Sequence, residues 1–190
     1  MRGWSVERKG SNVYMVRHGK DSLLLTGERT GTICEWKQWE KYYLPDFSLE
    51  GKTVLDVGAG CGETAYFFFE HGAKEVIAVE VDPIQVGLLK ENSEQNGWTS
   101  ANRSMKIIPR AFEVGDLATE KFDFAKIDIE GGEVDLLQLD RMDLPLVLEA
   151  HGKEMRDKLR QKFGLSVLVK ALPLEDVWLL GNRPLQPKVL

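Results

Sequence analysis

Long hydrophobic runs are missing from this 190-residue sequence, and cysteine is scarce. No apolar stretch has the length of a signal peptide or of a membrane-spanning helix, so we expect a cytoplasmic protein without a membrane partner. The two cysteines, Cys34 and Cys61, suggest neither a metal-ligand pair nor a disulfide framework. The fold must therefore rest on its hydrophobic core, and a chain of this length buries roughly 70% of its unfolded surface.

Basic charge is not in excess either. The net charge is −5, and residues 53–152 carry 19 acidic but only 8 basic side chains. Such a centre repels RNA or DNA, so the balance favours a small-molecule or otherwise neutral substrate. Nucleic acid stays open as an alternative, because five basic residues gather between positions 153 and 162. On a helix, the same charges would equally suit a solvated face.

From Thr53 onward, short apolar runs alternate with helix-like segments, which is typical of βαβ units around a parallel sheet. The segment between residues 172 and 177 is too short for a helical crossover, so the last two strands must pair antiparallel. The sequence therefore predicts a doubly wound α/β fold. The predicted strands are Thr53–Val57, Val76–Glu80, Met105–Pro109, Phe122–Asp128, Leu144–Ala150, Ser166–Leu172 and Val177–Leu180, and the predicted helices are Glu63–His71, Pro83–Asn96, Glu133–Arg141 and Lys153–Phe163.

The first 50 residues differ from the rest. Asn12–Arg17 and Leu23–Thr26 flank a turn and predict a small hairpin. Thr32–Leu44 predicts a helix whose aromatic residues pack on the edge of the sheet, or alternatively cover an active site. We expect one compact domain overall, with residues 1–50 as an N-terminal extension and candidate cap of the active site, and residues 51–190 as the cofactor-binding domain.

A glycine-rich turn, Asp56–Gly62, joins the first strand of this domain to its first helix. Such a turn lets the backbone approach a nucleotide-like cofactor, and the following helix points unpaired N–H groups towards an anion. Glu80 lies 22 residues beyond Gly58, where its carboxylate is expected to accept the hydroxyls of a ribose. The turn and the acid together predict a cofactor site.

The spacing of the glycines distinguishes between two cofactors. The dinucleotide fingerprint G-x-G-x-x-G, started at Gly58, needs a glycine where this chain has Glu63. A carboxylate there obstructs close packing and repels a pyrophosphate. Asp56 is instead placed to pair with the ammonium group of a methionine moiety. These residues favour S-adenosylmethionine (SAM) over NAD.

The turn Val54–Gly62 resembles motif I of the class I SAM-dependent methyltransferases. Val79–Pro83 looks like the acidic ribose motif of that superfamily, and Arg110–Phe112 occupies the place where it contacts the adenine. The resemblance implies a Rossmann-like sheet of seven strands, mostly parallel with an antiparallel last strand. The cofactor-binding residues that it implies are Asp56, Gly58, Ala59, Gly60, Glu80, Val81, Asp82, Ala111, Phe112 and Asp128.

The fourth strand ends without the Asn/Asp-Pro-Pro-Tyr motif of many amino methyltransferases. Instead, Lys126–Glu133 is similar to the Lys-Ile-Asp-(Val/Ile)-Glu-Gly-x-Glu signature of FkbM-type methyltransferases, and Leu148–Gly152 is similar to the Glu-x-His of that family. This resemblance implies methyl transfer to oxygen on a small molecule or glycan. A tRNA or rRNA methyltransferase and a non-catalytic SAM-binding or partner-binding domain remain as alternatives.

Four polar side chains, Asp128, Glu130, Glu149 and His151, are expected to meet at neighbouring strand ends. We predict Asp128, Glu130 and His151 as catalytic residues, with His151 as a general base near pH 7. In the alternative interpretation, Glu149 and His151 only orient the loop. Oxygen ligands here would also suit a hard divalent cation, but helix N-terminal stabilisation explains the same carboxylates, so we expect no metal.

Overall fold

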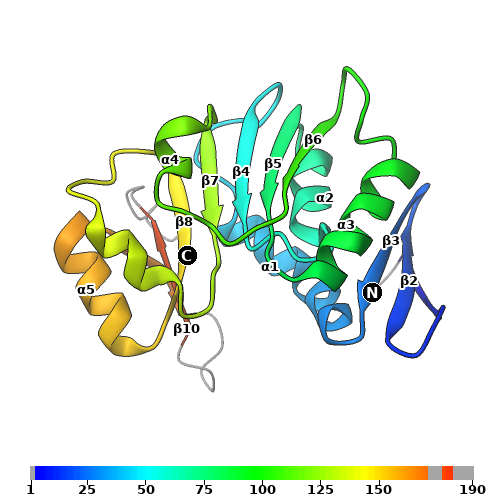
Figure 1. Ribbon diagram of the computed structural model, residues 1–190, viewed down its shortest axis with the longest axis horizontal. Coiled ribbons are helices and arrows are strands. Elements are labelled where there is room, and N and C mark those ends of the chain that lie inside the picture. The colour runs from blue at the N-terminus through cyan, green and yellow to red at the C-terminus, as the bar shows by residue number, and fades with distance from the viewer. Residues whose placement is uncertain (1–2, 171–176, 182–190) are drawn as a thin grey trace, which may run out of the picture.

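The computed structural model describes residues 3–170 and 177–181, which form two sheets flanked by helices (Figure 1). The larger sheet has seven strands in the order β6-β5-β4-β7-β8-β10-β9. Its strands are β4 (Thr53–Val57), β5 (Glu75–Val79), β6 (Ser104–Ile108), β7 (Phe124–Ile127), β8 (Leu146–His151), β9 (Ser166–Lys170) and β10 (Val177–Gly181). Each lies within two residues of its predicted bounds at both ends, except that the predicted end of the sixth strand falls outside the described residues.

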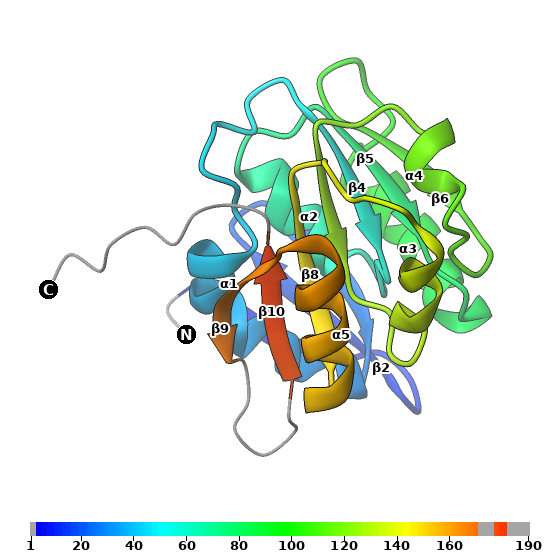
Figure 2. The ribbon, with the colours of Figure 1, turned by 90° about the vertical axis from the view of Figure 1, so that its left-hand side faces the viewer.

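The direction of the strands confirms the predicted fold class. β4 pairs in parallel with β5 and β7, and parallel pairing continues to β6 and β8. β10 runs antiparallel to both of its neighbours, β8 and β9 (Figure 2). The carboxyl ends of β4 to β8 therefore meet at one edge of the sheet, which is where ligands bind in folds of this kind.

Helices α2 (Glu63–Glu70), α3 (Pro83–Gln95) and α5 (Lys153–Phe163) lie where the sequence predicts helices. The start of α3 follows directly from local chemistry, because the Asp82 carboxylate accepts the N–H groups of Ile84 and Gln85. No helix among the described residues is long and apolar enough to cross a membrane.

The predicted helix Glu133–Arg141 is wrong in type and length. The chain forms a 3-10 helix there, η2 (Glu133–Gln138), and becomes extended at Leu139. Gly132 at its start offers no side-chain cap, so a common stabiliser of an α-helix start is absent there. A short helix α4 (Asp116–Thr119), which the sequence did not predict, follows β6.

Each face of the large sheet has its own hydrophobic core. On one face the aromatic side chains of α2, including Phe67 and Phe68, pack against residues of the N-terminal segment. On the other face Leu136 of η2 and Leu159 of α5 are fully buried. The sheet is thus covered on both sides, as a predominantly parallel sheet requires.

The N-terminal segment forms the smaller sheet, β1 (Trp4–Arg8), β2 (Val13–His18) and β3 (Asp21–Thr26), followed by the 3-10 helix η1 (Glu28–Glu35) and α1 (Trp36–Tyr42). The predicted hairpin is confirmed as β2 and β3. β1 was not predicted, because four of its five residues are exposed and carry no buried alternation. The predicted helix Thr32–Leu44 is α-helical only over α1.

Amide side chains of α3 and its C-terminal end join this smaller sheet to the domain: Gln95 and Asn96 bond the backbone of Ser22, and Asn92 bonds that of Leu24. Asn92 of α3 accepts the N–H of Leu24 at 2.7 Å and donates to the carbonyl of Leu24 at 2.8 Å. The same Nδ2 group donates to the carbonyl of Cys61 in the glycine-rich turn at 2.7 Å. The N-terminal sheet therefore lies against α3 and is connected directly to the predicted cofactor loop (Figure 1).

Candidate functional site

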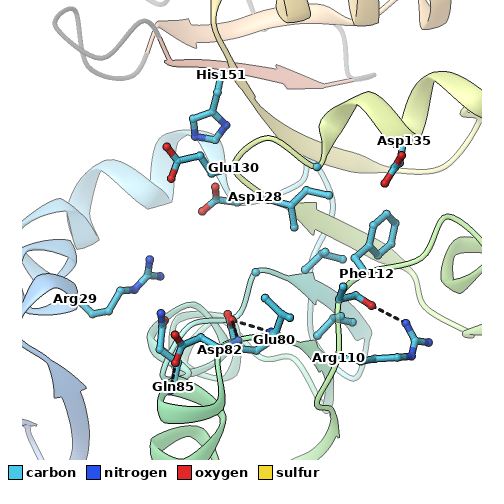
Figure 3. A pocket seen from close by; sticks show the side chains of 17 residues that line it. Arg29, Glu80, Asp82, Gln85, Arg110, Phe112, Asp128, Glu130, Asp135 and His151 are labelled. Carbon is cyan, nitrogen blue, oxygen red and sulfur yellow. Dashed lines mark hydrogen bonds between the residues drawn. The ribbon is translucent and has the colours of Figure 1, made fainter.

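A cavity of about 650 Å³ opens at the carboxyl ends of the parallel strands. Its volume lies within the range of pockets that hold small ligands. Loops after five strands line it, together with one residue of η1 (Figure 3). The lining residues are Arg29, Val57, Gly58, Val79, Glu80, Val81, Asp82, Gln85, Arg110, Ala111, Phe112, Asp128, Ile129, Glu130, Gly132, Asp135 and His151.

The cavity brings together nine of the predicted site residues. They are Gly58, Glu80, Val81, Asp82, Ala111, Phe112, Asp128, Glu130 and His151. Asp56, Ala59 and Gly60 are not part of its wall. The aromatic residues of α1 also lie elsewhere: Trp39 and Tyr42 are buried in the core against α2.

The backbone N–H groups of the glycine-rich turn are bonded within the protein. Gly58 and Ala59 both donate to the carbonyl of Val79, and Gly62 donates to the carbonyl of Ala59. The amides of Gly60 and Cys61 donate to carboxylates, those of Glu80 at 2.8 Å and Glu63 at 3.0 Å. The turn itself therefore offers no unpaired N–H group to an anion at these five positions.

Glu80 follows β5 and combines a structural role with a place in the cavity wall. Its side chain accepts three backbone N–H groups, from Gly60 at 2.8 Å, Val81 at 2.8 Å and Asp82 at 2.9 Å. These bonds fix the carboxylate between the turn after β4 and the start of α3 (Figure 3). A carboxylate offers about four acceptor sites, so one is left for a ligand.

Asp56 lies behind the cavity and has no exposed surface. One carboxylate oxygen accepts the hydroxyl of Thr64 at 2.6 Å. The other lies 3.3 Å from the ammonium nitrogen of Lys126, without the alignment of a hydrogen bond. The predicted contact of Asp56 with a ligand ammonium group is thus replaced by a contact with a lysine of the protein itself.

Lys126 is a fully buried cation on β7. Its ammonium group donates to the carbonyl of Gly58 at 2.8 Å and lies 3.5 Å from the carboxylate of Asp128. Burial alone would lower the pKa of Lys126, but the carboxylates of Asp56 and Asp128 outweigh it and raise that pKa. The lysine stays charged, and it ties the glycine-rich turn to the end of β7.

Acid–base groups gather at the ends of β7 and β8. Asp128, Glu149 and His151 each offer one side-chain atom within 4.8 Å of the others, and Glu130 extends towards the same region (Figure 3). His151 Nδ1 contacts the buried carboxylate of Glu133. This hydrogen bond raises the pKa of His151 above its usual value and orients its ring.

Glu149 is the protonatable group at the back of this cluster. Burial and the neighbouring charge of Asp128 raise the pKa of Glu149 to about 7, although the hydroxyl of Tyr43 donates to its carboxylate. Tyr43 follows α1 and is itself buried. The aromatic N-terminal segment therefore reaches the acid–base cluster from behind, a contact that the spacing in the sequence does not reveal.

Arg29 is the residue of the cavity wall that comes from the N-terminal segment. Its Nε and Nη2 atoms both contact one oxygen of the buried carboxylate of Glu63, at the start of α2. The charge of Glu63 raises the pKa of Arg29 above its usual value, although burial acts in the opposite direction. Sequence reasoning missed Arg29, although the unusual Glu63 after the glycines gave a signal that a buried cation must lie nearby.

Comparison with known proteins identifies relatives. The sequence model of the family described as "Ribosomal protein L11 methyltransferase (PrmA)" matches residues 26–125. A ribosomal protein L11 methyltransferase of Deinococcus radiodurans is 36% identical over 78 residues, which are 41% of this chain and 26% of that relative. The match thus spans about a quarter of the relative's length.

Solved structures of methyltransferases share the fold at low identity. Ribosomal protein L11 methylase of Lactobacillus delbrueckii subsp. bulgaricus has a TM-score of 0.55 and 19% identity, over 82% of this chain and 78% of its own. Fibrillarin of Aeropyrum pernix, crystallised with natively bound SAM, has a TM-score of 0.54 and 14% identity, over 93% of this chain and 97% of its own. These likenesses confirm the predicted Rossmann-like fold.

Two narrower predictions need correction or lack support. The FkbM methyltransferase of Methylobacillus flagellatus is 14% identical with a TM-score of 0.54, over 78% of this chain and half of its own, which reflects the common fold alone. The prediction of a small-molecule or glycan acceptor is wrong, because the description of the matching family names a protein, ribosomal protein L11, as the acceptor.

Proposed function

This chain belongs to the family of ribosomal protein L11 methyltransferases (PrmA), and we propose that it transfers the methyl group of SAM to a protein acceptor. One observation carries the proposal: a single cavity contains both the carboxylate expected for the ribose, Glu80, and an acid–base cluster around Asp128 and His151. The predictions of a class I SAM-dependent methyltransferase and of SAM as its cofactor agree with the family.

The cavity wall suits the two ends of the cofactor. The side of Glu80, Val81 and Phe112 offers one carboxylate and two apolar side chains, which fit a ribose and an adenine ring. On the opposite side, Gly58 has no side chain and lets a ligand approach the backbone closely, and Asp128 offers a negative charge for the ammonium group at the amino-acid end of the cofactor. An added Cβ at Gly58 would lie 1.8 Å from the carbonyl oxygen of Asp128, so no other residue fits there.

SAM supplies an electrophilic methyl group on a sulfonium when it is bound. The residues of this chain then hold the acceptor nucleophile in line with that methyl group, and proximity of this kind contributes roughly 7–11 kcal/mol. The methyl–sulfur bond would break as the new bond forms, and its electron pair would stay on the sulfur. A proton on the nucleophile passes to the cluster of Asp128, Glu149 and His151. Burial raises the pKa of Glu149 to about 7, and the hydrogen bond to Glu133 raises the pKa of His151 above its usual value, so both groups suit a general base.

Transfer to tRNA or rRNA is the alternative that the proposal must exclude. The basic helix α5 gives it little support, because Arg156 stacks over Trp178 at 4.0 Å and Lys162 donates to the carbonyl of Leu137 at 2.6 Å. These side chains are engaged within the protein. The acidic centre of the chain also disfavours a polyanionic acceptor.

The experiment uses isotopically labelled methyl-SAM with purified large ribosomal subunits as the acceptor mixture. We expect label in the protein fraction, with a mass increase of one CH₂ or more on ribosomal protein L11. The Asp128→Asn variant is the matched negative control. Label found only in the RNA fraction would establish the alternative, and the absence of label in both fractions would overturn the proposal.

A further inference from the structure

The cavity must provide a partner for one anionic group if SAM binds there, because the methionine moiety ends in a carboxylate. The glycine-rich turn does not offer its amides, since those of Gly58 to Gly62 already have acceptors within the protein. The buried carboxylate of Glu63 also places a negative charge in the first turn of α2, which disfavours a second carboxylate there. The partner of the carboxylate must therefore be sought among the cationic side chains of the wall.

Three side chains of the cavity wall are basic: Arg29, Arg110 and His151. Arg110 makes two hydrogen bonds to Asp116, at 2.6 and 3.0 Å, and another to the carbonyl of Ala111. It follows β6, on the side expected for the adenine. His151 belongs to the acid–base cluster, where Glu133 holds its Nδ1 atom. Arg110 is therefore not placed for the amino-acid end, and His151 has its role in the acid–base cluster.

Arg29 has both the position and spare donors. Only its Nε and Nη2 atoms contact Glu63, whereas a guanidinium has five N–H donors in a fixed fork. An added Cβ at Gly60 would lie 2.7 Å from Arg29 Nη2, so the guanidinium rests directly on the glycine-rich turn. In Figure 3 it points into the cavity between Asp128 and Gln85.

We propose that the guanidinium of Arg29 binds the carboxylate at the amino-acid end of SAM. The proposal rests on the proposed function, and it assigns a cofactor contact to the N-terminal segment. Arg29 reaches the cavity from η1, and Asp128 reaches it from the end of β7 (Figure 3). The two side chains carry opposite charges. They thus match a zwitterionic amino-acid group, with the ammonium at Asp128 and the carboxylate at Arg29. The ion pair with Glu63 keeps the guanidinium in place.

Two ligands that differ only at this end provide the test. S-adenosylhomocysteine contains the amino-acid group, whereas 5′-methylthioadenosine lacks it. Isothermal titration calorimetry should show that the wild-type protein prefers S-adenosylhomocysteine. In Arg29→Ala the dissociation constant of S-adenosylhomocysteine should rise about tenfold to a hundredfold, while that of methylthioadenosine stays unchanged. Arg29→Lys, which keeps a positive charge, should retain part of the preference.

Further variants separate binding from folding. Arg29→Ala leaves the buried carboxylate of Glu63 unpaired, so the double variant Arg29→Ala/Glu63→Gln removes that charge and should show the same loss of preference. Glu63→Gln alone keeps Arg29 and should retain the preference. Arg110→Ala is the matched arginine control, and it should change the affinity for both ligands by the same factor.

The outcomes distinguish this inference from the proposed function. If Arg29→Ala weakens both ligands equally, or neither, Arg29 does not bind the carboxylate, although the protein still binds the cofactor. If the wild-type protein binds neither ligand, the proposed function fails together with the inference. Loss of the preference in Glu63→Gln as well would assign the effect to the shape of the turn and overturn the role of the arginine.

Discussion

The ammonium nitrogen of Lys126 lies 3.3 Å from a carboxylate oxygen of Asp56, and neither side chain has any exposed surface. The pair connects two adjacent strands, since Asp56 and Lys126 are register partners in β4 and β7. A charged pair in the interior is costly to break, because the remaining partner stays buried without compensation.

Removal of the lysine should therefore destabilise the fold. We expect Lys126→Met to lower the free energy of unfolding by about 3–5 kcal/mol, as measured by urea denaturation. In the double variant Lys126→Met/Asp56→Asn, the cost should be smaller than the sum of the two single costs, because neither charge is then left alone. Strictly additive costs would show that the two side chains do not interact.

Glu80→Ala should weaken binding of S-adenosylhomocysteine about tenfold to a hundredfold, through loss of the ribose contact and of the support for the turn. Calorimetry measures the binding, and thermal unfolding measures the support. Glu80→Gln retains an acceptor for the backbone amides and should lose less stability than Glu80→Ala. An unchanged dissociation constant in folded Glu80→Ala would show that Glu80 is not the ribose carboxylate.

The pKa of Glu149 predicts a dependence of stability on pH. In the folded protein that pKa is raised from 4.5 to about 7 by burial and by Asp128, against the opposing effects of Tyr43, Lys126 and His151. Folding therefore favours the protonated carboxyl, so its contribution to stability is full below pH 4.5 and is lost as the pH rises through about 7.

Glu149→Gln removes this titration. Denaturation of the wild type and of Glu149→Gln should be compared at pH 5 and pH 8. We expect the stability difference to shift in favour of the variant at the higher pH. The raised pKa of His151 acts in the same direction in both proteins, because its main cause, the hydrogen bond to Glu133, is unchanged in the variant. A pH-independent difference would place the carboxyl's titration outside this window.

The acid–base cluster should affect turnover more than cofactor binding. We expect Asp128→Asn and His151→Ala to lower the rate of methyl transfer by about 10²–10⁴. His151→Ala should change the affinity for S-adenosylhomocysteine little, whereas Asp128→Asn also removes the charge assigned to the ligand's ammonium group and should weaken binding, though less than it lowers the rate. Addition of EDTA to the same assay should leave the rate unchanged, because Lys126 already compensates the charge of Asp128. Near-normal rates in both variants would mean that these groups only support the loop.

Elements with local signals could be predicted from the sequence. The large sheet follows from short apolar runs, and the start of α3 follows from Asp82 and Pro83, whose effect needs no other part of the chain. The position of Glu80 beside the glycine-rich turn follows from spacing in the βαβ unit. In each case the residues that cause the structure are close in sequence.

Contacts over long distances in the chain could not be predicted. Arg29 meets Glu63 and Tyr43 meets Glu149, across 34 and 106 residues. No periodicity encodes such pairs, because they depend on how the N-terminal segment packs on the domain. The same limit explains Asp56, whose buried partner Lys126 comes from another strand 70 residues later and replaces the expected ligand contact.

The hydrogen bonds of the Asn92 side chain to Leu24 and Cys61 have a consequence for the exchange of backbone amides with solvent. The N–H of Leu24 exchanges with solvent when its hydrogen bond to Asn92 opens. Asn92 also donates a hydrogen bond to the carbonyl of Cys61 in the glycine-rich turn. Local opening of β3 and loosening of the turn are thus parts of one event. A ligand that steadies the turn will slow deuterium uptake at Leu24, a position that it never touches.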